Sequence, residues 1–532
     1  MNREKFSLNL RYSFQGKLAL MVLIFFYACH SSKNYSRNIL KFNLTTEPPS
    51  LDWSITTDSS SVQVLNNLME GLCRYDKNLN PIPALAISWE VKEDGRKYIF
   101  HLRKNACWSD GRPVKAQDFV YSWQRLVNPE TASEYAYFLY LVKNARKINA
   151  GEIKDLSRLG IRAIDNFTLE VELERPAVYF PLITTFVSTF PLRQDLIKKY
   201  PDSWTEPEHL VTTGPFILKT WRHEYKLELE PNPYYYGEKP RLKKIVFYMV
   251  NEPTTALTLY ETGDLDLVRP PPSAIPSYQD SPEYHRHPFL ATYYLGFNVQ
   301  KPPLNNPRVR KALAMAIDRS QIPKILQGGQ IPAKSFIPPG MFGHNPKIGY
   351  DFNPKQAGEL LKQAGYESGK KLPPITLMFN IQQEHQLICE YVQAQWQAHL
   401  GITVYLKNME WKVFLKELDL DPPQVFRLGW VADYPDPDNF ARVFTSQSGN
   451  NHTNWKNPVY DQLVQLAVQE ADPEKRRAIY NRLQRILLEE ECVIVPLYFY
   501  VQNWLVKPYV RGLEFNPLGL FYFQSVWLEK NK

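Results

Sequence analysis

Hydrophobic and polar residues alternate along this chain with the two periods that distinguish strands from helices. Tyr98, Phe100 and Leu102 occupy every second position of their segment, which predicts a half-buried strand. The short apolar run 245–250 predicts a strand that is buried on both faces. Strand and helix signals interleave over the whole length, and there is no short internal repeat. We therefore predict a mixed α/β fold.

Three helices are predicted to begin at an Asn-Pro pair. Asparagine caps a helix N-terminus with its side chain, and proline suits the first helical position because no partner is needed for its missing N–H. After the first pair, Val309, Leu313 and Ile317 recur on one face, and Gly365 is expected to end the second helix. The pairs are Asn306-Pro307, Asn353-Pro354 and Asn457-Pro458.

Residues 1–28 have the pattern of an export signal. Basic residues precede the apolar run 18–28, which is about half of the roughly 20 residues that span a bilayer as a helix. Ala28-Cys29 resembles a bacterial lipoprotein signal, so we predict that Cys29 is lipidated and that the body is extracytoplasmic and anchored to the cell envelope by that lipid alone. A plain cleaved signal peptide is the alternative.

The remaining cysteines do not define a disulfide pattern. In an oxidising compartment four cysteines allow three full pairings, and the sequence does not choose among them. We expect zero to two disulfides, with buried free thiols as the alternative. These cysteines are Cys73, Cys107, Cys389 and Cys492.

Composition excludes two classes of protein. The 532 residues are 44% hydrophobic and 22% charged, which is typical of a globular chain and not of a disordered one. The net charge is +8, of which three charges belong to residues 1–28, so no nucleic-acid-binding surface is indicated. Aromatic residues reach 14%. Their rings suit wet pockets and interfaces, although core packing explains them equally well.

Motifs for catalysis are scarce. There is neither a G-x-S-x-G elbow nor an H-E-x-x-H pair, and the segment 365–370 lacks the spacing of a phosphate loop. His285 and His287 would face one side of a strand, but a surface pair explains them better than a metal site. Asp264 and Asp266 are interpreted as solvated strand or turn positions. We therefore expect a binding protein without metal or cofactor, and no enzyme.

The segment 86–125 resembles the signature region of family 5 extracellular solute-binding proteins, especially the oligopeptide-binding lipoproteins of ABC importers. The match is dense and continues in order over nearly all of the chain after residue 38. Its motifs are Ser88-Trp89, 100–103 (FHLR), 108–111 (WSDG), 116–119 (AQDF), 47–52 (EPPSLD), 70–72 (EGL), 213–215 (TGP), 309–319 (VRKALAMAIDR) and 428–434 (LGWVADY).

This resemblance implies a three-lobed periplasmic-binding-protein fold, type II-like and of cluster C, in which two lobes close over a cleft about a two-strand hinge. Lobe I would combine 38–70, 191–290 and 502–532. Lobe II would be the insertion 71–190, and lobe III would be 291–501. The implied partners are short peptides, with cell-wall peptides among them, and the permease and ATPase subunits of an importer. We expect a monomer.

The resemblance also implies a site. Asp433 would pair with the ammonium of a peptide N-terminus, and Arg427 would meet a C-terminal carboxylate. Arg427, Gly429, Val431 and Asp433 share one parity in an extended strand, and the first and last are roughly 20 Å apart at about 3.3 Å per residue. A turn acid and a structural ion pair are the alternatives for Asp433 and Arg427. Side-chain pockets would be lined by Trp411, Trp430, Tyr135, Tyr294, Tyr500 and His385, with a core role as the rival for each ring.

Several positions depart from the family pattern. Well-known members carry a disulfide at the places of Ala291 and Val431, and both cysteines are replaced here. An acid that helps hold the peptide N-terminus is Thr57 in this chain, and a basic residue used for the shortest peptides falls near Leu418. These changes leave peptide length open. Nickel complexes, haem or a sugar remain alternative ligands, a secreted peptidase is a third reading, and peptide sensing or a chaperone role is a fourth.

Overall fold

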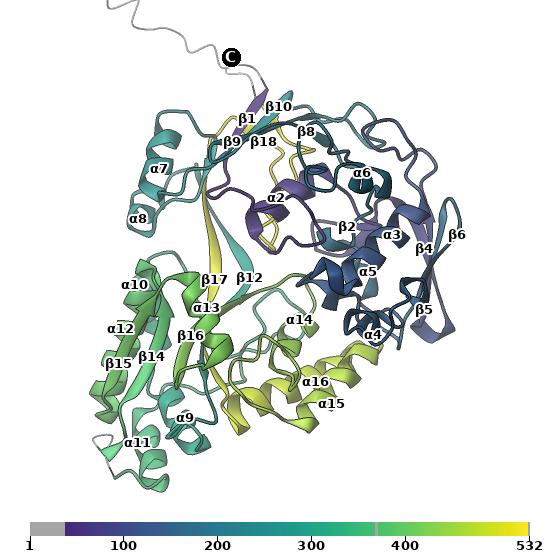
Figure 1. Cartoon of the computed structure of the whole chain (residues 1–532). Helices are drawn as coiled ribbons and strands as arrows, with labels where there is room; N and C mark the ends of the chain where they lie inside the picture. Colours follow the sequence, from purple (N-terminus) through teal and green to yellow (C-terminus); the bar gives the residue numbers. More distant parts are fainter. Residues whose placement is uncertain (1–37, 368–370, 530–532) are drawn as a thin grey trace, which may run out of the picture.

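The computed structural model describes residues 38–367 and 371–529, so the predicted signal segment 1–28 and the lipidation site Cys29 lie outside the described residues. One mixed sheet runs through most of the molecule (Figure 1). In spatial order its strands are β15 (Val404–Met409), β14 (Ile375–Asn380), β16 (Val425–Val431), β12 (Tyr284–Phe297), β17 (Ile494–Val506), β11 (Leu267–Val268), β1 (Ile39–Asn43), β10 (Lys244–Tyr248), β9 (Lys226–Pro231) and β8 (Phe216–Arg222), and β13 (Ile331–Pro332) pairs with β17.

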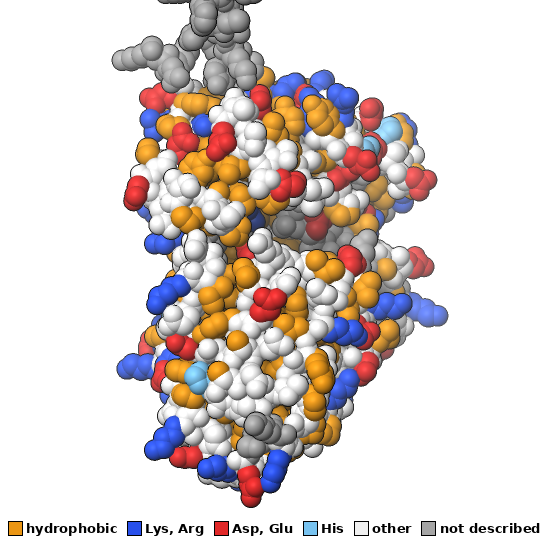
Figure 2. Space-filling model, turned by 90° about the vertical axis from the view of Figure 1, so that its left-hand side faces the viewer, with side chains coloured by type: hydrophobic (Ala, Val, Ile, Leu, Met, Phe, Trp, Pro, Cys, Tyr) orange, Lys and Arg blue, Asp and Glu red, His pale blue; other side chains and the backbone are white. Residues whose placement is uncertain are grey.

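Two long strands connect the two ends of this sheet. β12 has 14 residues and β17 has 13, and they pair antiparallel along their length. The pairing shifts register between Pro288 and Thr292, which breaks the ladder near its middle. The surface narrows to a waist at this height, between an upper part with β1 and β8 to β10 and a lower part with β14 to β16 (Figure 1 and Figure 2). The register shift therefore lies where we expect hinge bending.

Smaller sheets flank the large one. A four-stranded antiparallel sheet contains β4 (Ala86–Lys92), β5 (Lys97–Leu102), β7 (Thr168–Glu172) and β6 (Ile161–Asp165). Two short pairs complete the strands, β2 (Cys73–Tyr75) with β3 (Pro81–Pro83) and β18 (Val510–Arg511) with β19 (Trp527–Leu528).

Helices cover the sheets on several sides. They are α2 (Ser59–Leu68), α3 (Ala116–Val127), α4 (Ala145–Asn149), α5 (Phe180–Ile183), α6 (Gln194–Lys199), α7 (Pro253–Glu261), α8 (Ile275–Tyr278), α9 (Pro307–Met315), α10 (Ile322–Leu326), α11 (Pro354–Gln363), α12 (Gln383–Leu400), α13 (Trp411–Leu420), α14 (Asp438–Ala441), α15 (Pro458–Gln469) and α16 (Pro473–Arg485). Within residues 38–367 and 371–529, none of these is long and apolar enough to cross a bilayer.

The predicted local elements are confirmed in place but two are shorter than predicted: α9 ends at Met315, so the buried Ile317 lies beyond it, and β10 ends at Tyr248. The alternating residues Tyr98, Phe100 and Leu102 are buried on one face of β5, and the run at 245–247 is buried within β10. α9, α11 and α15 begin at the three Asn-Pro pairs, where each asparagine side chain accepts a backbone N–H. Gly365 follows the end of α11 with a φ of +93°, a left-handed backbone that glycine tolerates.

Two sequence interpretations need correction or completion. Asp266 is buried, not solvated, because it accepts hydrogen bonds from the backbone N–H of Lys41 (2.7 Å) and from the hydroxyl of Tyr509 (2.7 Å). His285 and His287 are half-buried and stack on Phe515. No group of three metal-ligating side chains occurs in the described part of the chain.

The four cysteines outside residue 29 are free thiols, and three of them are buried. Burial raises the pKa of Cys73, Cys389 and Cys492 to about 12, so these thiols stay protonated and unreactive at neutral pH. The structure therefore selects the expectation of no disulfide among these four cysteines.

The first and last segments of the chain meet in one core. β1 lies between β10 and β11. The side chains of Gln63 and Asn67 on α2 both donate to the carbonyl of Phe521, and Asn67 also accepts from the backbone N–H of Phe523. These contacts join residues more than 450 positions apart in the sequence.

Candidate ligand-binding site

β16 presents an open strand edge beside the waist. Its antiparallel partner β12 covers one side from Val425 to Val431. On the other side, β14 pairs only with Val425 and Phe426. From Arg427 to Val431, no further strand of the described residues occupies this edge. An exposed edge of this kind can add an extended peptide as an extra strand.

Asp433 lies two residues beyond the end of β16 and is surrounded by neutral donors. Its carboxylate accepts hydrogen bonds from the hydroxyls of Tyr135 (3.3 Å) and Tyr137 (3.2 Å) and from the amide of Asn439 (3.0 Å). Burial raises the pKa of Asp433, and these hydrogen bonds offset only part of that effect. The structure therefore places a half-buried acid without a cationic partner among residues 38–367 and 371–529.

Arg427 lies at the other end of the same strand and is 7% exposed. Its guanidinium donates to the side-chain oxygen of Asn380 (2.8 Å) and to the hydroxyl of Tyr500 (3.0 Å), and it lies 4.7 Å from the ring centre of Tyr293. Its Nε–H has no partner. Among the described residues no carboxylate forms an ion pair with it, which removes the structural ion pair proposed as the alternative.

Gly429 separates these two charged residues and faces Tyr500. A Cβ at this position would lie 2.9 Å from the Tyr500 hydroxyl, closer than side chains pack. Any larger residue would therefore displace Tyr500, whose hydroxyl accepts a hydrogen bond from Arg427. The glycine also leaves the backbone of the strand edge accessible.

The predicted pocket residues fall into different environments. Trp430 is half-buried and donates to Asn439 (2.9 Å), so it supports the same asparagine that holds Asp433. Trp411 begins α13 and is 44% exposed. His385 is buried on α12, where burial and the charge of Arg427 lower its pKa to about 3. It therefore stays neutral at physiological pH and offers no positive charge to a ligand.

Tyr294 belongs to the core, which corrects its interpretation as a pocket residue. It is 1% exposed and packs edge-on against Phe336 and Phe444. Successive residues of a strand face opposite sides, so its neighbour Tyr293 is the one that meets Arg427.

Other residues of this site carried no signal in the sequence. Tyr137 and Asn439 hold Asp433, whereas Asn380 holds Arg427. Each comes from a different segment, so only the folded chain brings them together. For Tyr137 the sequence offers one indication, because this residue lies two positions after the predicted pocket residue Tyr135 in a tyrosine-rich stretch.

The positions that lack the family disulfide are direct neighbours. Ala291 on β12 and Val431 on β16 face each other in the ladder. Opposed residues of antiparallel strands have Cα atoms about 4.5–5.5 Å apart, a separation that a disulfide spans. Thr57 is exposed, and Leu418 is a buried core residue, so neither replaces the charge that the family pattern places there.

The double substitution Ala291→Cys with Val431→Cys is expected to form a disulfide and to stabilise the fold by about 2–4 kcal/mol. Non-reducing peptide mapping checks the bond, and melting with and without reductant checks the stability. Ala291→Cys alone is the control. Two thiols that stay free under oxidation would show that the strands do not have this register.

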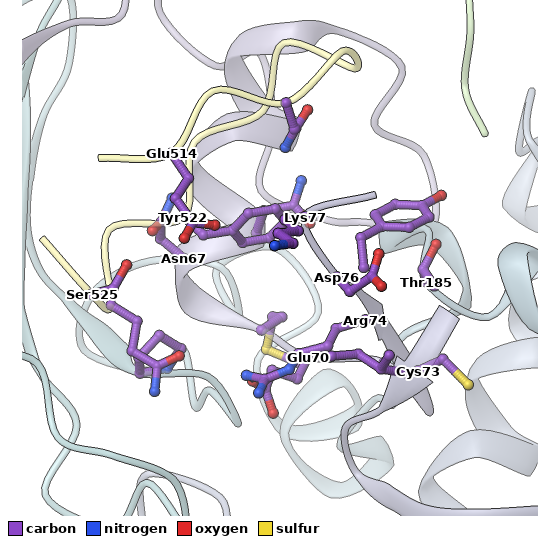
Figure 3. A pocket seen from close by; sticks show the side chains of 18 of the residues that line it. Asn67, Glu70, Cys73, Arg74, Asp76, Lys77, Thr185, Glu514, Tyr522 and Ser525 are labelled. Atoms are coloured by element: carbon purple, nitrogen blue, oxygen red, sulfur yellow. The ribbon is translucent and has the colours of Figure 1, made fainter. Parts of the chain in front are cut away.

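The largest of the described cavities lies elsewhere. It measures about 640 Å³ and lies between the end of α2, β2 and the C-terminal segment 513–525. Figure 3 shows Glu514, Tyr522 and Ser525 on one side and Asp76 and Thr185 on the other. None of the predicted ligand-contacting residues lines it.

Much of the polar wall of this cavity serves the fold. Glu70 accepts hydrogen bonds from Tyr235 and Tyr236, and burial raises its pKa. A Cβ on Gly71 would lie 2.3 Å from the carbonyl oxygen of Thr184. The family motif at 70–72 thus has a role in packing.

The sheet, the long paired strands and a strand-edge site with two charged ends define a periplasmic-binding-protein fold. Residues 80–452 match the sequence profile "Bacterial extracellular solute-binding proteins, family 5 Middle". The chain belongs to this family, and the predicted α/β fold class is confirmed.

Individual relatives cover nearly the whole chain. The oligopeptide-binding protein OppA of Bacillus subtilis is 34% identical over 93% of each chain. A probable deoxycholate-binding periplasmic protein of Escherichia coli, YgiS, is 33% identical over 93% of this chain and 94% of its own. The solved structure of the Escherichia coli murein tripeptide binding protein MppA has a TM-score of 0.83 at 34% identity and covers 93% of this chain and 99% of its own.

Proposed function

We propose that this protein captures short peptides outside the cytoplasm and delivers them to the permease of an ABC importer. The peptide would lie along β16 as an added strand. Its ammonium would meet Asp433, and the carboxylate of a peptide of suitable length would meet Arg427. Closure of the predicted lobes about β12 and β17 would then enclose it.

One observation carries this proposal: opposite charges without counter-ions lie at the two ends of one open strand edge. A buried charge is stable only when a partner compensates it. Asp433 has neutral hydrogen-bond partners, and Arg427 has an amide, a hydroxyl and an aromatic ring. A zwitterionic, extended ligand supplies both missing charges at once.

The non-peptide alternative is a bile-acid-like anion, which the relative YgiS brings to attention. Such a ligand has a carboxylate for Arg427 but no ammonium for Asp433. It would leave the half-buried Asp433 uncompensated, so the charge pattern favours a peptide. The same argument disfavours a neutral sugar.

Native mass spectrometry of the protein purified from its own cells tests the function. We expect a series of co-bound masses that tandem fragmentation identifies as peptides. A single non-peptide mass would favour the alternative ligand class. Intact recovery of the bound peptides after denaturation distinguishes binding from hydrolysis by a peptidase.

Peptide affinity is expected to decline as the pH falls. Burial raises the pKa of Asp433 above its usual value of 3.8, and only the ionised carboxylate attracts an ammonium. Affinity for free-amine peptides should therefore be full above this raised pKa and be lost as the pH falls through it, beginning at a higher pH than for an ordinary aspartate. Calorimetry at a series of pH values measures this. N-acetylated peptides are the control, and the same profile for both ligands would contradict the assignment.

A further inference from the structure

A second cavity lies where residues 137–183 of the predicted lobe II meet residues 434–465 of the predicted lobe III. It measures about 410 Å³. α4 and the neighbouring segment to Tyr179 form one wall, and the other is formed by Tyr434, Arg442 and, from α15, Gln465. Tyr137 and Tyr434 separate it from Asp433, because both residues line the cavity and Tyr137 also donates to Asp433.

This junction is held by direct contacts between the two walls. The hydroxyl of Tyr179 donates to Asp438 (2.7 Å), and Arg442 donates to the same carboxylate (2.9 Å) and to the Tyr179 oxygen (3.3 Å). The rings of Tyr179 and Tyr434 stack with centres 5.8 Å apart. The charge of Arg442 is therefore already matched by Asp438.

The other cations of the cavity are not matched. Arg146, Lys147 and Arg175 line it together with a single acid, Glu174. In the part of the chain that the structure describes, none of the three forms an ion pair. Glu174 accepts instead from the backbone N–H of Asn144 (2.7 Å). The cavity thus holds more cations than acids, and Arg175 is the partly buried one, since Arg146 and Lys147 are exposed.

Arg175 is the cation of this cavity with an unsatisfied buried hydrogen-bond donor. Its Nε–H is buried and has no hydrogen-bond partner. Burial and the neighbouring charge of Arg442 lower its pKa, and the acids Asp438 and Glu174 offset only part of this effect. On the facing wall, the amide oxygen of Gln465 also lacks a partner. An amide can turn its NH₂ toward the cavity, so both walls offer donors to one ligand.

We propose that this cavity binds a small organic or inorganic oxyanion with phosphate or carboxylate groups, and that the bound anion holds the two walls together. Guanidinium groups pair with the planar edges of both groups through two hydrogen bonds. The anion would supply the missing charge for Arg175, Arg146 and Lys147. Because its donors come from both sides of the junction, it would bind the closed arrangement more tightly than an open one.

The anion site is independent of the proposed peptide function, but its coupling to peptide affinity rests on that function. If peptide binding also requires closure, each ligand strengthens the other by the same factor. This gives two separate measurements, the affinity for the anion alone and its change when a peptide is bound.

The test uses inorganic phosphate and citrate as probes against chloride at equal ionic strength. We expect saturable thermal stabilisation of the wild-type protein by at least one probe, which also tells the two anion classes apart. Arg175→Gln should weaken the affinity for this anion at least about tenfold, because the substitution removes a charge-assisted hydrogen-bonded pair. Gln465→Glu should abolish the response, since it places a carboxylate of the chain itself in the cavity. Arg158→Gln, an exposed change of the same charge outside the cavity, should leave the response intact.

The melting temperature in chloride separates a ligand role from a structural one. The buried Nε–H of Arg175 has no hydrogen-bond partner to lose, so Arg175→Gln should fold and melt near the wild-type temperature. A clear drop would assign it a structural role and overturn the proposal. An unsaturable response, or equal responses of Arg175→Gln and Arg158→Gln, would overturn it as well. Saturable binding with no change in peptide affinity would overturn the coupling to closure.

Discussion

Asp433→Ala is expected to weaken the binding of free-amine peptides by about 2–5 kcal/mol, which corresponds to a loss of roughly thirtyfold to several thousandfold. The loss follows because the peptide ammonium would stay buried without a counter-charge. Peptides with an acetylated N-terminus carry no ammonium, so their affinity should change far less. Calorimetry with matched free and acetylated peptides measures the difference.

Asp433→Asn is the control for shape, because it keeps a group that can accept from Tyr135 and Tyr137. It should lose nearly as much affinity as the alanine variant if charge is the cause. An equal loss for free and acetylated peptides would remove Asp433 as the anchor of the peptide N-terminus. In that case the acid would have a packing role at the junction with Tyr135 and Tyr137.

Arg427→Met is expected to weaken the binding of peptides with a free C-terminal carboxylate by a similar amount, about 2–5 kcal/mol. Methionine retains much of the apolar stem and removes the positive charge at this end of β16. The affinity for amidated peptides of the same sequence should fall much less. A series of peptide lengths, measured by calorimetry, should show the largest effect at the length that spans the strand.

Tyr500→Phe is the matched control for Arg427. It removes the hydroxyl that accepts from the guanidinium (3.0 Å) and leaves the charge in place. Melting curves report whether either variant disturbs the fold, since Arg427 also donates to Asn380. If Arg427→Met lowers the affinity of amidated and free peptides equally, the arginine acts through the shape of the site and does not meet the carboxylate.

The sequence predicted the elements that local physics decides. Periodicity at Tyr98–Leu102 and the Asn-Pro pairs identify a strand and three helix starts without tertiary information. The signature segment 86–125 identified the family, yet its best motifs serve the fold. Trp108 is buried and donates to Asp118, which also accepts from the backbone of Lys115 at the start of α3.

The rest depended on contacts between distant segments. Parity along β16 indicated which residues share a face with Arg427, but it did not indicate which ring of β12 lies opposite. The register places Tyr293 opposite Gly429 and turns Tyr294 into the core. Asp266 looked solvated because Tyr509, which donates to it, is 243 positions away. A pairing of that kind leaves no mark in a local pattern.

The contact between α2 and the C-terminal segment has a consequence for when this protein can fold. Gln63 and Asn67 of α2 are synthesised more than 450 residues before Phe521 and Phe523, to which they are hydrogen-bonded. Closing so long a loop has an entropic cost that only the complete core offsets. Gln63 and Asn67 therefore lack these hydrogen-bond partners until the C-terminal segment has been synthesised. This part of the core is therefore expected to complete its folding only after synthesis of the whole chain.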